Sequence, residues 1–468
     1  MFVSNLKIKN YRLFDTNDNF QIKNFNVPDN ENNGSGLNVL VGENGCGKTT
    51  ILDAIALTIL EYKTDSFNIT DMHNINEITE IITEANDKFN VNGIFPKSNF
   101  DSIGFKFIGK LRNRNNKSLL QSPVTSEQYY ISENPDKPSA SSPELRCNIT
   151  NSFGSKRYSG IDILYLDRNR LFQTRSGMYN STRFDRIMSD FNFQYNKNTE
   201  NYIDLNDDLN KKVKLGKIEN KYLEDAINKF YEISGYKIKL DFINNYLPFS
   251  NAKFTIPQEN NIQLELSDLG SGYEMIFSLI YSYYLSTQNG NYLIILIDEP
   301  ELHLHPKLQE KFITFLLEIS KTSQIIITTH SPLLVKQLAY NKNVKNIVLK
   351  KDKTVKEFDS RKLSYISSNE TNYLAFNLAT EEYHNELYEE LRLKYEELKN
   401  TENISINRFD NEFFIQNKKE PQAYPEKGKE NRVSLHTFVR NQIHHNAENG
   451  NVNESDLRNS INIMRNYL

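Results

Sequence analysis

The sequence predicts an α/β protein built on a mostly parallel sheet, and three observations lead to this prediction. From residue 261 onward, short apolar runs typical of strands buried on both faces alternate with helical stretches. A glycine-rich segment, Gly42–Thr49 (GENGCGKT), stands between the apolar run 37–41 and an apolar helix that starts near Lys48. A further apolar run, 292–300, ends in two adjacent acids followed by a proline.

The composition is ordinary for a globular protein. Of 468 residues, 38% are hydrophobic and 25% are charged, and this length suits two or three domains. A net charge of −4 argues against binding nucleic acid through bulk charge, although a local basic face keeps nucleic acid open as a partner. Cys46 and Cys147 are too few for a disulfide framework and indicate a reducing compartment. Because no apolar run approaches about 18 residues and no apolar leader opens the chain, we expect a cytoplasmic protein without a membrane partner.

The pattern along the chain divides it into five regions. Residues 2–9 alternate apolar and polar, and 18–25 reads as a returning strand, so we expect an N-terminal antiparallel sheet. The expected regions are a first lobe with the glycine-rich loop (1–62), an irregular β-containing insertion (63–160), a helical lobe (161–260), a second lobe (261–360) and a helical C-terminal extension (361–468). One helical stripe of the extension, too short for a long coiled coil, consists of Leu387, Leu391, Tyr395 and Leu398.

The glycine-rich segment fits the P-loop pattern, and its flanking strand and helix disfavour a chance turn. Glycines let the loop turn tightly and aim backbone N–H groups at phosphate oxygens, and the helix that follows offers its positive end. Lys48 is then expected to reach the β- and γ-phosphates, and Thr49 to hold Mg²⁺, which makes ATP and Mg²⁺ the expected cofactors. The expected ATP contacts are Gly42, Asn44, Gly45, Gly47, Lys48, Thr49 and Thr50. We interpret Cys46 as a small filler of a variable loop position rather than a redox switch.

The acids at 298 and 299 end a buried strand. Carboxylates at the carboxyl edge of a parallel sheet lie where ligands bind, so Asp298 is expected to complete the Mg²⁺ shell. Glu299 is the expected general base for the attacking water. His330 follows a second apolar strand, where it can contact the γ-phosphate. The competing interpretations are an exposed acidic turn and a structural histidine, and the order of the motifs favours the catalytic interpretation.

A second candidate anion site lies at Leu269–Glu274 (LGSGYE), just before a helix. Small residues at a helix N-terminus offer N–H groups and a hydroxyl. Because this segment is separate from the P-loop, its expected ligand is the ATP of a second subunit. The expected contacts are Leu269, Ser271 and Gly272.

Together, the segments IKNYRLF, GENGCGKT, LSDLGSGYE, LIDEPELHLHP and TTHSP resemble the RecF-like and OLD-like ABC-type ATPases, relatives of the chromosome-maintenance ABC ATPases. The likeness covers residues 1–62 and 160–360. It implies a two-lobed ABC-type P-loop NTPase head that hydrolyses ATP as a homo-oligomer, with each ATP sandwiched between the P-loop of one copy and the signature segment of another. It also implies a D-loop at 301–305 and places Arg12 near the nucleotide.

The chain departs from this family pattern in several places. Gly270 occupies the usual position of the signature serine, so Ser271 becomes the candidate hydroxyl. The Q-loop glutamine has no clear position, and Gln121 is only a candidate. The lack of a long coiled-coil pattern argues against a DNA-tethering chromosome protein. The lack of an acidic Toprim pattern after residue 360 argues against the nuclease arrangement of the OLD proteins within one chain.

The C-terminal segments NYLAFNLATEEYHNELY and SLHTFVRNQIHH resemble ABC-type ATPases of bacterial anti-phage systems, such as the Septu and retron-linked ATPases. This likeness implies ATP-dependent control of a partner effector, often a nuclease, in antiviral defence. One alternative is a self-contained ATP-gated ribonuclease, because Arg440 and His445 fit the Arg-x4-His spacing of HEPN ribonucleases. A solvated polar helix competes with that interpretation, and a metal site at His436, His444 and His445 lacks a well-spaced acidic or cysteine ligand. A RecF-like DNA-repair ATPase is a further alternative, which the slight acidity of the chain disfavours.

Overall fold

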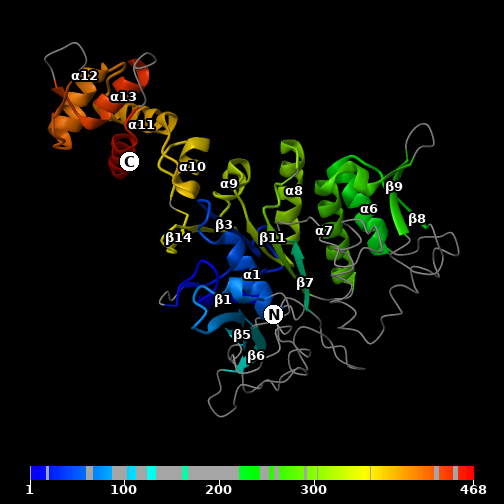
Figure 1. Ribbon diagram of the computed structural model, residues 1–468. Helices are drawn as coiled ribbons and strands as arrows, with labels where there is room; N and C mark the ends of the chain where they lie inside the picture. Colours follow the sequence, from blue (N-terminus) through cyan, green and yellow to red (C-terminus); the bar gives the residue numbers. More distant parts are fainter. Residues whose placement is uncertain are drawn as a thin grey trace. The chain divides into compact units, whose positions relative to one another are not determined.

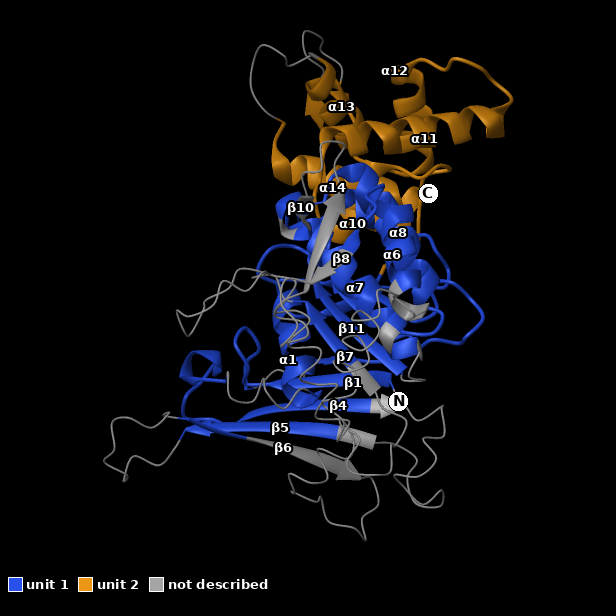
Figure 2. Ribbon diagram, turned by 90° about the vertical axis from the view of Figure 1, so that its right-hand side faces the viewer, with its two compact units in different colours: residues 1–334, 340–357 blue, residues 335–339, 358–468 orange. Residues whose placement is uncertain are grey.

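The computed structural model forms two compact units, residues 1–334 with 340–357 and residues 335–339 with 358–468 (Figure 2). The first unit contains all the nucleotide motifs found in the sequence. The second consists mainly of helices. The structure describes residues 2–16, 20–59, 67–86, 103–111, 124–132, 161–166, 221–242, 252–257, 263–288, 292–302, 304–358, 360–425, 432–445 and 452–468.

A six-stranded sheet lies at the centre of the first unit, in the order β14-β13-β3-β12-β11-β7. All neighbours pair in parallel except β14, which is antiparallel to β13. The apolar runs predicted from the sequence form its buried strands, so the expected mostly parallel sheet is confirmed. Because its parallel strands share a direction, their carboxyl ends meet at one edge. The strands are β3 (Leu37–Gly42), β7 (Ile161–Leu166), β11 (Tyr292–Asp298), β12 (Gln324–Thr328), β13 (Lys345–Leu349) and β14 (Val355–Glu357).

The expected N-terminal antiparallel sheet is also present, in the order β2-β1-β4-β5-β6. Its last three strands come from the region predicted to be an irregular insertion. Helix α1 (Lys48–Ile59) lies between the two sheets, and one hydrophobic cluster with Ile55, Phe107 and Leu296 joins all three layers (Figure 1). The strands are β1 (Phe2–Lys9), β2 (Phe20–Ile22), β4 (Thr79–Asn86), β5 (Ile103–Leu111) and β6 (Val124–Ser132).

The remaining helices of the first unit include α6 (Lys221–Ser234) and α7 (Ser271–Gln288), which pack together through Phe230 and Phe277 at 5.4 Å between ring centroids. The region 161–260, expected to be helical, also contains strands. These are β7 and two strands of a small sheet, β8 (Lys239–Phe242) and β9 (Ala252–Pro257). The third strand of that sheet, β10 (Gln263–Glu265), follows this region. Helices α8 (Pro306–Ile319) and α9 (Pro332–Leu338) follow β11 and β12. Among the described residues, no helix is long and apolar enough to cross a bilayer.

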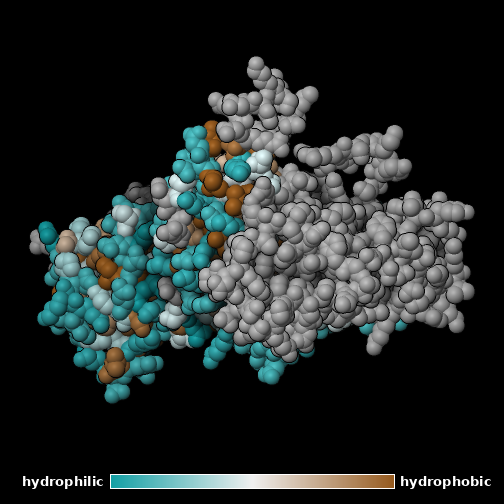
Figure 3. Space-filling view, turned by 90° about the horizontal axis from the view of Figure 1, so that it is seen from below, coloured by the Kyte–Doolittle hydropathy of each residue, from teal (hydrophilic) through white to brown (hydrophobic). Residues whose placement is uncertain are grey.

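The second unit has its own hydrophobic core, in which Leu387, Leu391 and Tyr395 are buried as expected. Leu398 is 79% exposed, so its assignment to that stripe was wrong, because the helix ends one residue later. In the coloured part of Figure 3, which leaves much of that face grey, apolar residues form small groups among mainly hydrophilic ones. The helices are α10 (Ser368–Phe376), α11 (Glu381–Lys399), α12 (Ile406–Phe409), a π-helix at Asp410–Asn417, α13 (Leu435–His445) and α14 (Glu454–Tyr467), with a short hairpin of β15 (Tyr424–Pro425) and β16 (Arg432–Val433).

Candidate functional site

The glycine-rich segment forms a loop between β3 and α1, and two of its glycines are required by the backbone. Gly42 has φ +148°, and a Cβ there would lie 2.2 Å from the carbonyl oxygen of Leu349. Gly47 has φ +106°, and a Cβ there would lie 2.9 Å from the ring of Phe14. Side chains other than hydrogen would therefore be strained at both positions. Asn44 and Gly45 are exposed between them, whereas Thr50 is buried in the first turn of α1.

Lys48 is buried at the start of α1 and contacts the loop itself. Its Nζ donates to the carbonyl oxygens of Gly42, at 2.7 Å, and Glu43, at 3.0 Å. Burial lowers the pKa of Lys48, and the nearby carboxylates Glu299 and Asp298 act in the opposite direction. The ammonium is therefore held inside the loop where phosphate is expected.

Asp298 ends β11 and connects the loop to the neighbouring strand. Its carboxylate accepts a hydrogen bond from the Thr49 hydroxyl at 3.2 Å and another from the Thr328 hydroxyl. The side chain is fully buried, and burial raises its pKa. A hydroxyl and a carboxylate are oxygen ligands of the kind that Mg²⁺ takes, so Thr49 and Asp298 fit the expected ion.

Glu299 follows in a left-handed conformation, with φ +49°, that residues other than glycine rarely adopt. Its backbone N–H donates to the carbonyl and hydroxyl oxygens of Thr328, at 3.2 and 3.1 Å, and these bonds hold the conformation. Its Oε1 lies 3.7 Å from Nε2 of His330. The two residues expected to act on the γ-phosphate and its attacking water therefore face each other. Backbone strain of this kind is common at functional sites.

Glu301 is a further member of the site, which the sequence placed only within the expected D-loop. Its Oε1 accepts hydrogen bonds from the Thr329 hydroxyl at 2.9 Å, the His330 N–H at 2.8 Å and the Ser331 N–H at 3.0 Å. Burial raises the pKa of this carboxyl group. Glu301 thus holds the turn that carries His330. The parallel register pairs Asp298 with Thr328, so aligning the two strands by their last residues could have shown this partnership.

Arg12, expected near the nucleotide, is bound by acidic residues in this structure. Its guanidinium donates to Asp71 at 2.7 Å and also binds Asp53. Asp53 accepts a further hydrogen bond from the Tyr165 hydroxyl at 2.5 Å. Since Asp53 lies one turn after Thr49 on α1, Arg12 ties the phosphate-loop helix to the turn after β1.

The signature segment lies at the start of α7. Leu269 ends a short 3-10 helix, Ser271 is the first residue of α7, and Gly272 is buried. Gly270 has φ +100°, a backbone conformation that favours glycine at this position. The 18-residue helix α7 therefore begins directly after a glycine turn, with its first N–H groups and the Ser271 hydroxyl together at its positive end.

The C-terminal histidines do not share one environment. His436 is buried, with Nδ1 2.8 Å from the Ser460 hydroxyl oxygen, which also lies 2.9 Å from Nε2 of His384. Burial lowers the pKa of both rings to about 3. The guanidinium carbon of Arg440 lies 5.6 Å from the centre of the Tyr388 ring, and His444 is exposed. Within the described part of the chain, no group of three His, Cys, Asp or Glu residues could hold a metal ion. The side chain of His445, at the end of α13, and all of Gln121 lie outside the described residues.

Comparison with known proteins agrees with the P-loop assignment. The family model described as "AAA domain, putative AbiEii toxin, Type IV TA system" matches residues 37–336, more than half of the chain. The retron Ec83 probable ATPase of Escherichia coli is 31% identical over 175 residues, covering 34% of this chain and 30% of that protein. Endonuclease GajA of Bacillus cereus (strain HuB5-5) is 24% identical over 414 residues, covering 74% and 60% respectively. Septu protein PtuA of Bacillus thuringiensis is 52% identical over 48 residues, covering 10% and 12%.

Each of these alignments spans less than two thirds of the relative's own length. The predicted likeness to retron-linked and Septu ATPases is confirmed. So is the predicted α/β fold class of a P-loop NTPase, with a mostly parallel sheet, an N-terminal antiparallel sheet and a helical C-terminal extension. The chain belongs to the family of AAA-domain ATPases described as putative AbiEii toxins of type IV toxin–antitoxin systems.

Proposed function

We propose that this chain hydrolyses ATP with Mg²⁺, dimerises when it binds ATP, and controls a partner effector in anti-phage defence. The observation that carries the proposal is the grouping of Lys48, Thr49, Asp298, Glu299 and His330 at the carboxyl edge of one parallel sheet. Thr49 contacts Asp298 and Glu299 faces His330, so motifs far apart in the sequence meet in space. ATP hydrolysis is the chemistry that uses this set of groups.

Each group has a distinct part in the proposed reaction. Mg²⁺, when bound, neutralises charge on the β- and γ-phosphates, and Thr49 and Asp298 supply its protein ligands. Lys48 balances the phosphate charge from inside the loop. Glu299 accepts the proton of the attacking water, and His330, 3.7 Å away, contacts the γ-phosphate. Glu301 keeps His330 in place through the backbone.

The second candidate anion site supports dimerisation. Gly270–Gly272 open an 18-residue helix, and a helix start of this length favours an anion. In the proposed dimer, this segment of each copy closes over the ATP held by the P-loop of the other. The γ-phosphate is then shared by two chains, so ATP binding favours the dimer and hydrolysis weakens it.

Control of an effector is supported by the relatives and by the separate second unit. The relatives include a retron ATPase, a Septu protein and an endonuclease. A unit with its own hydrophobic core offers a partner a surface that is independent of the catalytic groups. We favour a separate nuclease as the effector over an intrinsic ribonuclease. Arg440 packs over Tyr388, which itself lies in the hydrophobic core of the second unit, and a structural role accounts for that contact.

The mass of the Glu299→Gln variant, measured by light scattering with Mg²⁺ and ATP, tests the proposal. Loss of the general base should leave ATP bound and trap the dimer, so the mass should double only when ATP is present. Lys48→Ala, which removes the phosphate contact, should stay monomeric under the same conditions. A Glu299→Gln variant that binds ATP and remains monomeric would contradict the proposed dimer. Cleavage of total cellular RNA by the wild type, but not by His445→Ala, would favour the intrinsic ribonuclease.

A further inference from the structure

The hairpin that joins β13 to β14 brings two lysines, Lys351 and Lys353, into contact with the phosphate loop. Parallel pairing of β13 with β3 sets Leu349 opposite Gly42, so the tip at 350–354 emerges beside the start of the loop. The tip is closed by backbone hydrogen bonds between Lys350 and Thr354 at 3.0 Å and between Lys353 and Lys350 at 3.0 Å. Asp352 also accepts hydrogen bonds from the N–H and the hydroxyl of Thr354. These hydrogen bonds fix the backbone of the tip and therefore the directions in which its Cα–Cβ bonds point.

Lys353 reaches the crest of the loop. Its Nζ donates to the carbonyl oxygen of Gly45 at 3.2 Å, and it lies 3.5 Å from that of Cys46. The same ammonium lies 5.8 Å from the centre of the Phe14 ring, which fills the space left by the missing side chain of Gly47. Lys353, Phe14 and the loop thus form one contact cluster.

The backbone of Lys353 makes this arrangement unusual. Its φ of +64° lies in the left-handed region, where glycine and asparagine are favoured and lysine is uncommon. The hairpin turn itself requires this conformation. Lysine at a position where glycine would be unstrained points to a role for its side chain. Contact with the phosphate loop is the role that the geometry offers.

The contact between Lys353 and the loop determines where the N–H groups of the loop point. In a planar trans peptide the C=O and the N–H point in opposite directions. When Lys353 holds the carbonyls of Gly45 and Cys46 on its own side, the N–H groups of Cys46 and Gly47 point to the other side. These N–H groups are the ones with which a P-loop binds phosphate oxygens.

Lys351 holds the other part of the same loop. Its Nζ lies 2.8 Å from a carboxylate oxygen of Glu43. Because Lys351 is 69% exposed and Glu43 is 29% exposed, solvent weakens this ion pair. The two lysines nevertheless bind the loop at residues 43 and 45–46, so the hairpin tip contacts two separate parts of the loop.

We propose that the tip of the β13–β14 hairpin is a phosphate-loop clamp, in which Lys353 is a positioning residue for ATP and Lys351 a weaker support. Lys353 holds the loop with its N–H groups turned toward the phosphates. ATP then binds without having to reorder the loop, which strengthens affinity. The clamp rests on the proposed ATP site but involves residues outside its motifs.

Titration of the full-length chain with Mg²⁺–ATP in a calorimeter tests the clamp. Lys353→Asn keeps a residue suited to the left-handed conformation and removes the ammonium. We expect its Kd for Mg²⁺–ATP to rise about tenfold, the loss typical of one hydrogen bond to a charged group, while kcat and Tm hold steady. Lys353→Arg restores a donor and should recover most of the affinity. Lys351→Gln should change Kd only about twofold.

The matched control is Lys356→Gln, which removes one positive charge from an exposed position on the same hairpin and should leave Kd unchanged. If the wild type itself does not bind Mg²⁺–ATP, the proposed function fails. If the wild type binds and Lys353→Asn binds equally well, the clamp is wrong and the function stands. A Kd that rises equally in Lys356→Gln would reduce the effect to bulk charge, and a large fall in Tm for Lys353→Asn would make Lys353 a folding residue. Either result overturns the clamp.

Discussion

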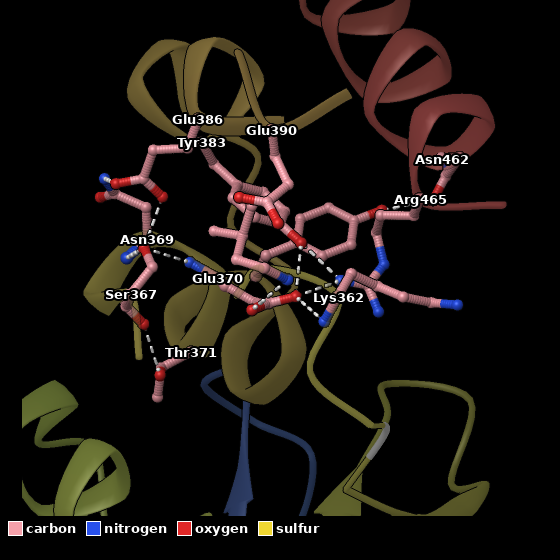
Figure 4. A network of polar contacts seen from close by, with 12 residues as sticks. Lys362, Ser367, Asn369, Glu370, Thr371, Tyr383, Glu386, Glu390, Asn462 and Arg465 are labelled. Carbon is pink, nitrogen blue, oxygen red and sulfur yellow. Dashed lines mark hydrogen bonds and ion pairs between the residues drawn. The ribbon is translucent and has the colours of Figure 1, made fainter. Parts of the chain in front are cut away.

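Glu370 in the second unit and Asp298 in the first are both fully buried carboxylates, but their partners differ in kind. In the second unit, the fully buried Glu370 pairs with the guanidinium of Arg465 at 3.1 Å and accepts hydrogen bonds from the Lys362 N–H at 2.8 Å and the Tyr383 hydroxyl at 3.2 Å (Figure 4). In the first unit, Asp298 accepts hydrogen bonds from two hydroxyls, and Glu301 from a hydroxyl and two backbone N–H groups.

The two carboxylates therefore differ in how their charge is balanced. A carboxylate paired with a guanidinium inside a core has its charge balanced within the fold. Burial raises the pKa of Asp298 and Glu301. Keeping these two carboxyl groups charged in the folded state therefore costs free energy. A bound cation would relieve that cost at Asp298. The comparison predicts that removing the charge of Arg465 destabilises the second unit, whereas removing the charge of Asp298 stabilises the first.

The largest effect on stability is expected from Arg465→Met. This change leaves Glu370 buried without its guanidinium, so the free energy of unfolding should fall by about 3–5 kcal/mol, as when one partner of a buried pair is removed. Urea denaturation followed by circular dichroism measures the change. Arg408→Met is the matched control, because its ion pair with Glu412 is exposed and its loss should be small. Equal losses in both variants would remove the structural role assigned to the buried pair.

Glu301→Ala should have the next largest effect, and this effect should be on catalysis rather than on stability. Without the acceptor, the turn that carries His330 loosens, and ATP turnover should fall roughly 10- to 100-fold, in the range seen when supporting residues are removed. Glu301→Gln keeps an acceptor oxygen and should retain most of the activity. Turnover assays on both variants, with Glu310→Ala as a control on the exposed face of α8, measure the effect. Full activity in Glu301→Ala would show that His330 needs no such support.

Asp298→Asn should have the smallest effect on stability, with the opposite sign. A raised pKa in the folded state means that the native protein binds this proton more tightly than the unfolded chain does. Stability from this group therefore falls as pH rises from the unfolded pKa of about 3.8 through the higher folded pKa. The neutral amide avoids it, so Tm should rise at pH 7 while Mg²⁺-dependent turnover is lost. Thermal melts at pH 4 and 7 check this, because the gain should shrink at the lower pH.

Local patterns in the sequence predict much of the fold and the site. The buried strands ending at Gly42, Asp298 and Thr328 follow from apolar runs, and the P-loop follows from a contiguous motif. Glu301 and Lys353 were missed because their roles depend on strand register, which brings together residues far apart in the chain. The insertion was expected to contain β-strands, but the sequence did not place β4–β6 in one sheet with β1, since that sheet forms by pairing between distant segments. The stripe through Leu398 failed because periodicity does not show where a helix stops packing.

Phosphate release from Mg²⁺–ATP by the wild type beside Glu299→Gln tests the central claim most directly. The wild type should turn over ATP, and the variant should be slower by about 10²- to 10⁴-fold, the usual contribution of a general base, with an unchanged Tm. A Glu299→Gln variant that releases phosphate at the wild-type rate would contradict the assignment of this strand end as the catalytic centre.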